Sequence, residues 1–303
     1  MKNLLKILPL IPLCLACSND IGEGPGGQKD KTIGFGAKME QTRAVAGLSD
    51  IQANGFSVWG GFSANDHLFD GRKVTYAGGQ WGYTNPEVWT FNTYNFYAVY
   101  PSTIQATYTA PKTFTITDYS ISDNRETDLL VAKHEDHNYP TDGNFVGLNF
   151  AHVLTQLEFV GSSTEASSMA FLNSIVLYGE GLPAMATYNA TSATWALGTG
   201  TTETAPFLSS DNEGNGWQLS MGGNTVLSEL MVYPKSEDKK VKLVLTTFNG
   251  TIEEKTVELP PLAWEAGRRY RYTFSVDPNM YITFSEPEVM EWQTASAGNI
   301  VVE

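Results

Sequence analysis

Apolar and polar residues alternate with a period of two along most of the chain, which is typical of β-strands that bury one face. The alternation is clearest in YRYTFSV, residues 270–276, where Tyr270, Tyr272, Phe274 and Val276 would face one side and the residues between them the other. Similar runs, separated by Gly, Asn, Asp and Pro, predict further strands at residues 56–63, 94–101, 114–121, 155–161, 173–179, 241–248 and 255–260. Strands with one buried and one wet face predict an all-β fold made of β-sandwiches.

Two sandwich domains fit the length of 303 residues. The polar stretch HEDHNYPTDGN, residues 134–144, reads as a loop and suggests a domain break shortly after it. We therefore predict an N-terminal domain over residues 33–146 and a C-terminal domain over residues 147–303. Helical signal is scarce and is limited to a turn near residues 164–171.

The first residues have the pattern of an export signal. Two lysines precede an apolar run from Leu4 to Ala16, which is shorter than the ~20 residues needed to span a bilayer. Leu15 and Ala16 before Cys17 resemble a bacterial lipobox, in which a signal peptidase cuts before a cysteine that carries lipid. An ordinary secretory signal with two incidental cysteines is the alternative, because Cys14 stands where a lipobox usually has leucine.

On the lipobox interpretation, residues 1–16 are a lipoprotein signal peptide and residues 17–32 a flexible tether. The tether is rich in glycine and polar residues, which bury little apolar surface. Its S-N-D start resembles the acidic surface-export signal of Bacteroidetes lipoproteins. Both cysteines lie at the signal, so the folded part has neither disulfides nor thiolate metal sites.

Charge excludes some partner classes. The formal net charge is -14 and the pI about 4.7, and no basic cluster is longer than the pair Arg268 and Arg269. Nucleic acid and anionic lipid both require a positive face, so neither is an expected partner.

The chemical motifs of enzymes and metal sites are weak. His134 and His137 flank two acids, but HEDH lacks the helical H-E-x-x-H spacing and a third ligand, so we interpret it as a solvated loop without metal. His152 reads as a hydrogen-bonded structural residue. Neither G-x-S-x-G nor a cysteine with a partnering histidine occurs, and YGEGLPA reads as a turn rather than a phosphate cradle. We therefore predict neither a catalytic site nor a cofactor, although two neighbouring carboxylates of a glycosidase could be paired only by the fold.

Tryptophans suggest an alternative binding function. Trp59, Trp81 and Trp89 lie in a region rich in Gly, Tyr and Asn, and exposed rings beside amides could hold sugars. Core packing needs only apolar bulk, and we favour the core for these residues.

Several stretches in order resemble the fimbrillin (Mfa-like) family of Bacteroidetes, whose members are lipoprotein precursors of type V pilus subunits. After the lipobox they are IGFGAKMEQTRA, FSVWGGF, YNFYAVYPS, TDLLVAKHEDHNYPTDGNFVGLNFAHVLTQLEF, LMVYP, LAWEAGRRYRYTFSV and ITFSEPEVMEW. The resemblance covers nearly the whole chain, and it implies two tandem transthyretin-like β-sandwich domains.

The resemblance also implies processing and assembly at the cell surface. An arginine-specific surface protease would cut after Arg43, leave Ala44 as the new N-terminus, and free the strand that precedes it together with the lipid. That strand alternates Ile33, Phe35, Ala37 and Met39 on one face. Subunits would then join by strand exchange, with other pilin subunits as partners. The candidate donor is the short apolar run Ile300, Val301 and Val302, which could instead be the last edge strand of its own domain.

The sequence thus predicts a structural pilin, anchored in the outer membrane through Cys17 until it is cut and then part of an adhesive fimbria. Host or bacterial surface ligands would be its adhesion partners. The alternative is a monomeric glycan-binding surface lipoprotein that keeps its lipid, and a third hypothesis is an enzyme of surface polysaccharide breakdown.

Overall fold

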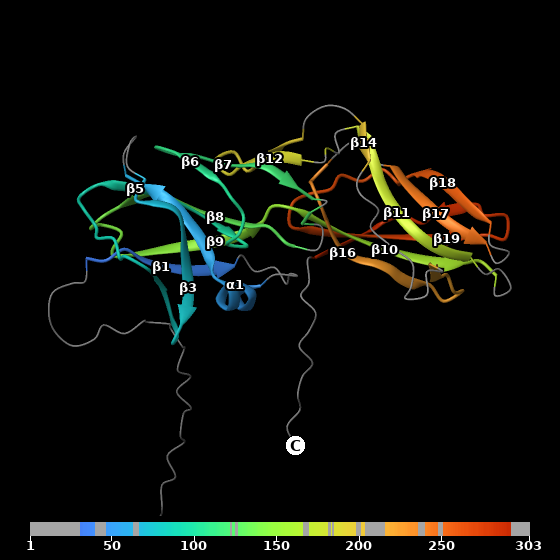
Figure 1. Cartoon of the computed structure of the whole chain (residues 1–303), viewed down its shortest axis with the longest axis horizontal. Helices are drawn as coiled ribbons and strands as arrows, with labels where there is room; N and C mark the ends of the chain where they lie inside the picture. The colour runs from blue at the N-terminus through green and yellow to red at the C-terminus, as the bar shows by residue number, and fades with distance from the viewer. Residues whose placement is uncertain are drawn as a thin grey trace, which may run out of the picture. The chain divides into compact units, whose positions relative to one another are not determined.

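The computed structural model describes residues 31–39, 47–62, 67–121, 123–124, 127–165, 170–180, 183, 185–197, 201–203, 216–235, 240–247 and 251–291. These residues form mostly β-strands, and α1 (Leu48–Asn54) is the one α-helix among them. The all-β prediction is confirmed (Figure 1). The prediction that the two sandwiches are transthyretin-like domains in tandem stays a prediction. In the described ranges no helix has the length and apolar character needed to cross a membrane.

The first sandwich pairs a seven-stranded sheet with a four-stranded sheet. In spatial order the larger sheet contains β1 (Gly34–Met39), β9 (Phe145–His152), β8 (Leu130–Asn138), β5 (Thr93–Tyr100), β2 (Phe56–Gly61), β3 (Phe69–Ala77) and β4 (Gln80–Tyr83). The smaller sheet contains β13 (Thr194–Ala196), β12 (Met185–Asn189), β7 (Thr113–Ser120) and β6 (Thr107–Thr109). Between them lies a core that includes Trp59, Tyr97, Phe114 and Tyr188.

The opposite face of the seven-stranded sheet is buried as well. Along β5 the side chains alternate, so that Tyr97 enters the core between the two sheets while Phe96 and Ala98 enter a second core. The sheet coils so strongly that its two edges meet. The contact is seen in a 2.8 Å hydrogen bond that the Tyr83 hydroxyl of β4 donates to the carbonyl of Ile33, just before β1. This second core is therefore enclosed largely by the sheet itself.

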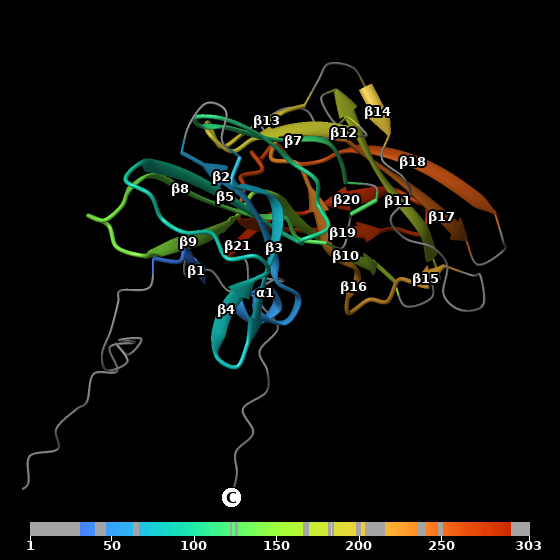
Figure 2. The same cartoon turned by 60° about the vertical axis from the view of Figure 1, so that its left-hand side comes forward.

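The second sandwich consists of two five-stranded sheets (Figure 2). One contains β16 (Asn224–Val232), β10 (Thr155–Ser163), β19 (Arg268–Val276), β20 (Ile282–Phe284) and β21 (Glu288–Glu291). The other contains β14 (Thr201–Glu203), β11 (Ala170–Glu180), β17 (Lys240–Thr247), β18 (Ile252–Glu258) and β15 (Trp217–Gln218). Phe159 and Tyr272 from the first sheet share a core with Leu172 and Leu243 from the second.

Strand periodicity predicts side-chain direction correctly in β19. Tyr270, Tyr272, Phe274 and Val276 are all buried, and the residues between them are partly exposed. Each predicted strand also has a counterpart, although the ends differ by a few residues. The local alternation therefore carried enough information to locate the strands.

Two sequence predictions are wrong. The polar stretch at residues 134–144 is a loop only in its second part, because residues up to Asn138 belong to β8. Helix α1 was not expected, and its seven residues bury only Ile51. At the predicted turn, Thr164 and Glu165 form a bend and residue 170 begins β11, while residues 166–169 lie outside the described ranges.

Strands from later in the chain complete the first sandwich. β12 pairs with β7 in antiparallel fashion and β13 extends the same sheet. The smaller sheet of this sandwich thus draws on residues from both sides of position 147. The division of the chain into domains at residues 33–146 and 147–303 stays a prediction.

Candidate functional site

β1 is an edge strand with one sheet neighbour. Among the described strands it pairs only with β9, in parallel, from Gly34 opposite Phe145 to Met39 opposite Phe150. A strand at an edge is held by a single ladder of backbone hydrogen bonds. Any other extended segment can make the same bonds to β9.

The inner face of β1 fills the second core of the first sandwich. Ile33 and Phe35 are buried, and Ala37 and Met39 pack against the same core, as the alternation predicted. The Phe35 ring lies 5.2 Å from Phe69, 5.5 Å from Phe96 and 5.6 Å from Tyr83, measured between ring centroids. Burying one such side chain stabilises a fold by about 1.5–3 kcal/mol.

Backbone groups anchor the beginning of β1 to neighbouring loops. The Ile33 N–H donates to the Glu87 carbonyl at 2.8 Å, and the Gly34 N–H donates to the Asn144 carbonyl at 3.0 Å. The same Asn144 carbonyl accepts a 3.1 Å hydrogen bond from the Trp89 indole. These contacts use main-chain atoms of β1, so they depend on its extended shape and little on its sequence.

A histidine pair supports the β8–β9 hairpin next to these contacts. His137 Nδ1 lies 3.1 Å from His134 Nε2, and the other ring nitrogens lie 3.1 Å from the Gly143 carbonyl and 3.0 Å from the Gly147 carbonyl, respectively. His137 is buried and stacks on Trp89 with ring centroids 4.7 Å apart. Burial lowers the pKa of His137, which favours its neutral form, and the Nε2–H of the neutral ring donates to the Gly143 carbonyl. The predicted solvated loop is therefore wrong for both histidines.

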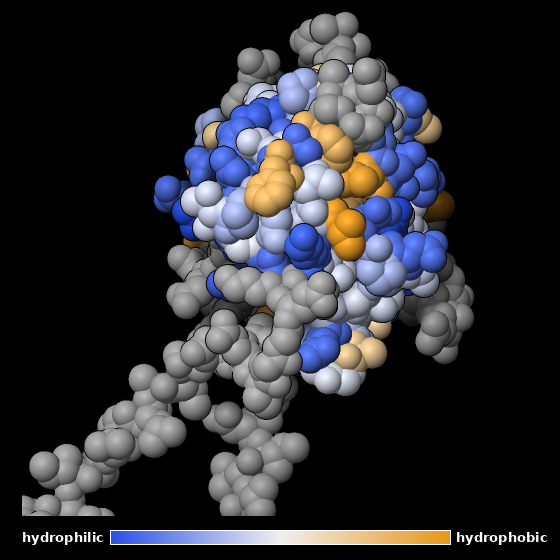
Figure 3. Space-filling view, turned by 90° about the vertical axis from the view of Figure 1, so that its left-hand side faces the viewer, coloured by the Kyte–Doolittle hydropathy of each residue, from blue (hydrophilic) through white to orange (hydrophobic). Residues whose placement is uncertain are grey.

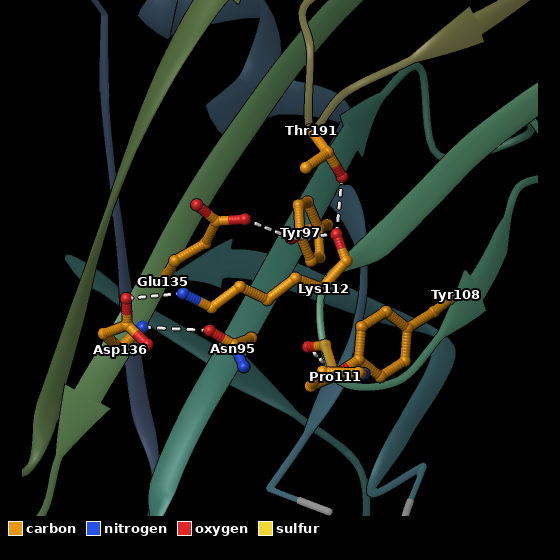
Figure 4. Close-up of polar contacts among 8 residues, drawn as sticks. All are labelled: Asn95, Tyr97, Tyr108, Pro111, Lys112, Glu135, Asp136 and Thr191. Carbon is orange, nitrogen blue, oxygen red and sulfur yellow. Dashed lines mark hydrogen bonds and ion pairs between the residues drawn. The ribbon is translucent and has the colours of Figure 1, made fainter. Parts of the chain in front are cut away.

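A polar cluster joins β5 and β8 of the larger sheet to the β6–β7 and β12–β13 turns of the smaller one (Figure 4). The Tyr97 hydroxyl of β5 contacts the Glu135 carboxylate of β8 and donates to the Lys112 carbonyl at 2.8 Å. The same carbonyl accepts a hydrogen bond from the Thr191 hydroxyl, in the turn between β12 and β13. The Lys112 ammonium pairs with Asp136 at 2.6 Å.

These contacts give the cluster a structural role. Burial and the adjacent Glu135 raise the pKa of Tyr97, so its hydroxyl stays protonated and holds the two sheets together. The described residues include no group of three or more His, Cys, Asp or Glu side chains arranged to hold a metal ion.

Apolar side chains are exposed near the beginning of β1. Figure 3 looks onto the end of the sandwich that carries the β8–β9 hairpin, where hydrophobic residues gather among hydrophilic ones. Phe91, Val88 and Phe145, from the segments around this hairpin, are 82%, 57% and 48% exposed. The surface beside β1 is therefore partly apolar.

The tryptophans considered for sugar binding belong to the core. Trp59 and Trp89 are buried, and Trp81 is partly buried against Phe56, with ring centroids 5.0 Å apart. A sugar-stacking ring must face solvent, so neither Trp59 nor Trp89 can form such a platform in this fold. His152 is also buried, and its Nδ1 lies 2.6 Å from the Asp128 carboxylate, which agrees with the structural role predicted for it.

Other predicted site residues lie outside the described ranges. They are Cys17, Arg43, Ala44, Ile300, Val301 and Val302. Their roles in lipidation, processing and strand donation stay predictions. Arg43 follows Met39, the last residue of β1, by four positions in the sequence.

Sequence reasoning missed Phe145, which is paired with Gly34 across the β1–β9 ladder. Gly34 and Gly36 alternate with Ile33 and Phe35, and glycine inside a strand often marks the close approach of another residue to the backbone. This alternation was the available signal. Which residue approaches depends on a pairing between segments more than a hundred positions apart.

Comparisons with known proteins cover most of the chain. The model of a family described as fimbrillin-like matches residues 42–292. A fimbrial protein from Bacteroides vulgatus has a similar structure, with a TM-score of 0.62 and 18% identity, covering 87% of this chain and 100% of that one. A candidate cell adhesion protein from Bacteroides ovatus gives a TM-score of 0.57 and 14% identity, covering 89% of this chain and 100% of that one. No curated protein matches the chain.

Proposed function

Because the chain belongs to the fimbrillin-like family, we propose that it is a structural subunit of a cell-surface fimbria that serves adhesion. The family match and the shared fold with a fimbrial protein support this role. Its partners would be other pilin subunits and ligands on host or bacterial surfaces. The protein would be the substrate of a protease and have no catalytic activity of its own.

The maturation route extends this proposal. The precursor is exported, lipidated at Cys17 and anchored in the outer membrane, and an arginine-specific surface protease cuts between Arg43 and Ala44. The observation that carries the proposal is that β1, an edge strand with one neighbour, ends four residues before Arg43. A cut at this position leaves β1 attached to the folded chain by non-covalent contacts alone.

Loss of β1 would create an acceptor groove. It removes Ile33, Phe35, Ala37 and Met39 from the second core and leaves the hydrogen-bonding groups of β9 without their ladder. Unpaired strand edges beside an apolar groove bind extended segments by strand addition. A donor strand from another subunit restores the ladder and refills the core.

The candidate donor follows the last described strand. β21 ends at Glu291, nine positions before Ile300, and an extended chain of that length reaches about 30 Å. Ile300, Val301 and Val302 would supply apolar side chains and backbone hydrogen bonds to the groove of a neighbouring subunit.

Proteolysis of the precursor tests this route. We would treat a chain beginning at Ser18 with an arginine-specific protease and follow it by N-terminal sequencing and native gels. We expect an early cut that exposes Ala44 as the new N-terminus, followed by a ladder of oligomers. The variant Arg43→Gln should stay whole at this position and monomeric.

Arg268→Gln is the matched control, because Arg268 lies in the second sandwich, in β19, with its side chain 47% exposed. It should be cut and assemble like the unaltered chain. A precursor that resists cutting at Arg43 would contradict this maturation route, and a cut product that neither forms oligomers nor binds an added donor strand would contradict strand exchange.

A further inference from the structure

The outer face of β1 carries two glycines beneath an aromatic ring. Gly34 and Gly36 alternate with the buried Phe35, and the ring of Phe145 in β9 lies over both of them. A Cβ atom on Gly34 would lie 3.1 Å from Phe145 Cδ2, and one on Gly36 would overlap Cε1 and Cζ of the same ring. Gly36 is buried, although it faces outward.

Glycine inside a strand weakens it, so its presence twice in a six-residue strand needs a physical reason. Close approach of Phe145 provides one, because the ring packs directly on the backbone of β1. An aromatic residue covering a glycine on the neighbouring strand is a known way to stabilise a sheet edge. Phe145 is still half exposed, so it can change rotamer, but it then loses this packing.

The inner face imposes the opposite requirement. Phe35 sits among Phe69, Tyr83 and Phe96, and a small side chain there would leave a cavity in the aromatic core. Seen from β9, the neighbouring strand must therefore place a large apolar residue between two small ones. The strand that occupies this place in the structure, β1, runs parallel to β9.

We propose that Phe145 and the Phe35 pocket together select the strand that occupies this groove. The partner is an extended segment with the pattern small, large apolar, small at three consecutive positions, running parallel to β9. This inference rests on the proposed exchange of β1 and names the chemistry of the incoming strand. Phe145 selects for small residues on the outer face of that strand, and the pocket of Phe35 selects for a large apolar residue on its inner face.

The C-terminal sequence of this chain matches the pattern poorly. Within residues 293–303, small residues two positions apart occur only as Ala295 with Ala297 and as Ser296 with Gly298. The residue between them is Ser296 in the first case and Ala297 in the second, and neither fills the space of a phenylalanine. A second copy of this chain is therefore a weaker donor than a subunit whose donor segment carries the full pattern.

Peptide binding to the cut precursor tests the selection. The precursor is cut at Arg43 and freed of its N-terminal fragment, and it is then titrated into a low concentration of a fluorescent peptide with the sequence KTIGFGAKM, residues 31–39, while binding is read by anisotropy. Valine in place of Gly36 should weaken binding about fivefold, which corresponds to the loss of one favourable cross-strand pair. Valine in place of Lys38 is the matched control, because Lys38 lies on the same face, is exposed and pairs with Asn149.

The receptor variant Phe145→Ala identifies the residue that selects. On this receptor the Gly36→Val peptide should bind as well as the parent peptide, because the ring that it would displace is gone. A peptide of residues 294–303 should bind the unaltered receptor at least tenfold more weakly than KTIGFGAKM, since it cannot fill the Phe35 pocket. Thermal unfolding of the uncut Phe145→Ala precursor checks that this variant is folded.

The outcomes separate this inference from the proposed function. If cut precursor binds none of the peptides, the exchangeable groove itself is wrong. If the parent peptide binds and the Gly36→Val peptide binds equally well, or is weakened equally on the Phe145→Ala receptor, the groove stands and selection by Phe145 is overturned. Tight binding of peptide 294–303 would overturn selection by the Phe35 pocket.

Discussion

Each sandwich contains a parallel strand pair, β1 with β9 in the first and β10 with β19 in the second, and the two pairs differ in how they are enclosed. β10 lies between β16 and β19, and β19 also pairs with β20 and β21. Both strands of that pair are hydrogen-bonded on two sides, whereas β1 is bonded to β9 alone among the described strands. The same kind of pairing thus joins two central strands in one sandwich and a central strand to an edge strand in the other.

The outward faces of the two pairs differ as well. In the second sandwich Glu158 of β10 accepts hydrogen bonds from Arg269 at 2.8 Å and from Arg271 at 2.9 Å, both on β19. In the first, Phe145 lies on the glycines of β1. A charged network across two strands fixes their register and requires particular side chains on both strands. A ring that packs on a glycine backbone requires only that the residues beneath it are small.

The largest expected effect comes from removing the side chain that makes β1 part of the core. Phe35→Ala should lower the free energy of unfolding of the precursor by about 3–5 kcal/mol, because it leaves a cavity among three aromatic rings. Urea denaturation measures the change. Lys38→Ala, on the exposed face of the same strand, should cost less than about 0.5 kcal/mol. A loss below 1 kcal/mol for Phe35→Ala would show that β1 adds little to the core.

Breaking the network of Glu158, Arg269 and Arg271 tests how much it stabilises the β10–β19 pair. Glu158→Gln should destabilise the chain by about 2 kcal/mol, less than a fully buried network would lose, because the Arg271 side chain is 35% exposed. Glu288→Gln is the control, since the Glu288 side chain is 62% exposed and contacts Arg271 at 3.3 Å, and it should cost less than about 1 kcal/mol. Equal effects of the two changes in urea denaturation would refute the role of the buried carboxylate.

Hydrogen exchange compares the two pairs directly. In uncut precursor the amides of residues 35–39 should exchange about tenfold faster than those of residues 157–161, because an edge strand can open locally while the rest of the sheet stays intact. Mass spectrometry of peptides covering the two strands measures the rates. Equal protection would mean that β1 opens only when the whole sandwich unfolds.

The smallest expected effect is a loss of folding stability at mildly acidic pH. The pKa of buried His137 lies below the ordinary value of about 6.5, so the unfolded chain takes up its proton first as the pH falls. The stability that the neutral ring contributes is fully present above pH 6.5 and is lost as the pH drops towards the lowered pKa. The other charged or titratable groups acting on this ring are His134 and Asp142.

Chemical denaturation between pH 7.5 and 5.5 measures this loss. His137→Asn should flatten the dependence relative to the unaltered chain. A steeper loss in the His137→Asn variant would contradict the neutral state assigned to this ring.

Local patterns explain why some features were predictable and others were not. The faces of β1 and β19 were predicted correctly because side chains in any strand alternate, whatever its partner. The polar sequence around His134 and His137 suggested a loop, yet Trp89, from a distant segment, stacks on His137 and buries it. Helix α1 was missed because seven residues with one buried side chain produce almost no periodic signal.

By itself the sequence determined the strand content, the inner face of β1 and the family, since each depends on order and periodicity along the chain. The tertiary structure alone decided that β1 runs parallel to β9 at an edge, and that Phe145 covers its glycines. Those features depend on pairing between segments far apart in the chain, and such pairing is set by the packing of the whole sandwich rather than by either segment.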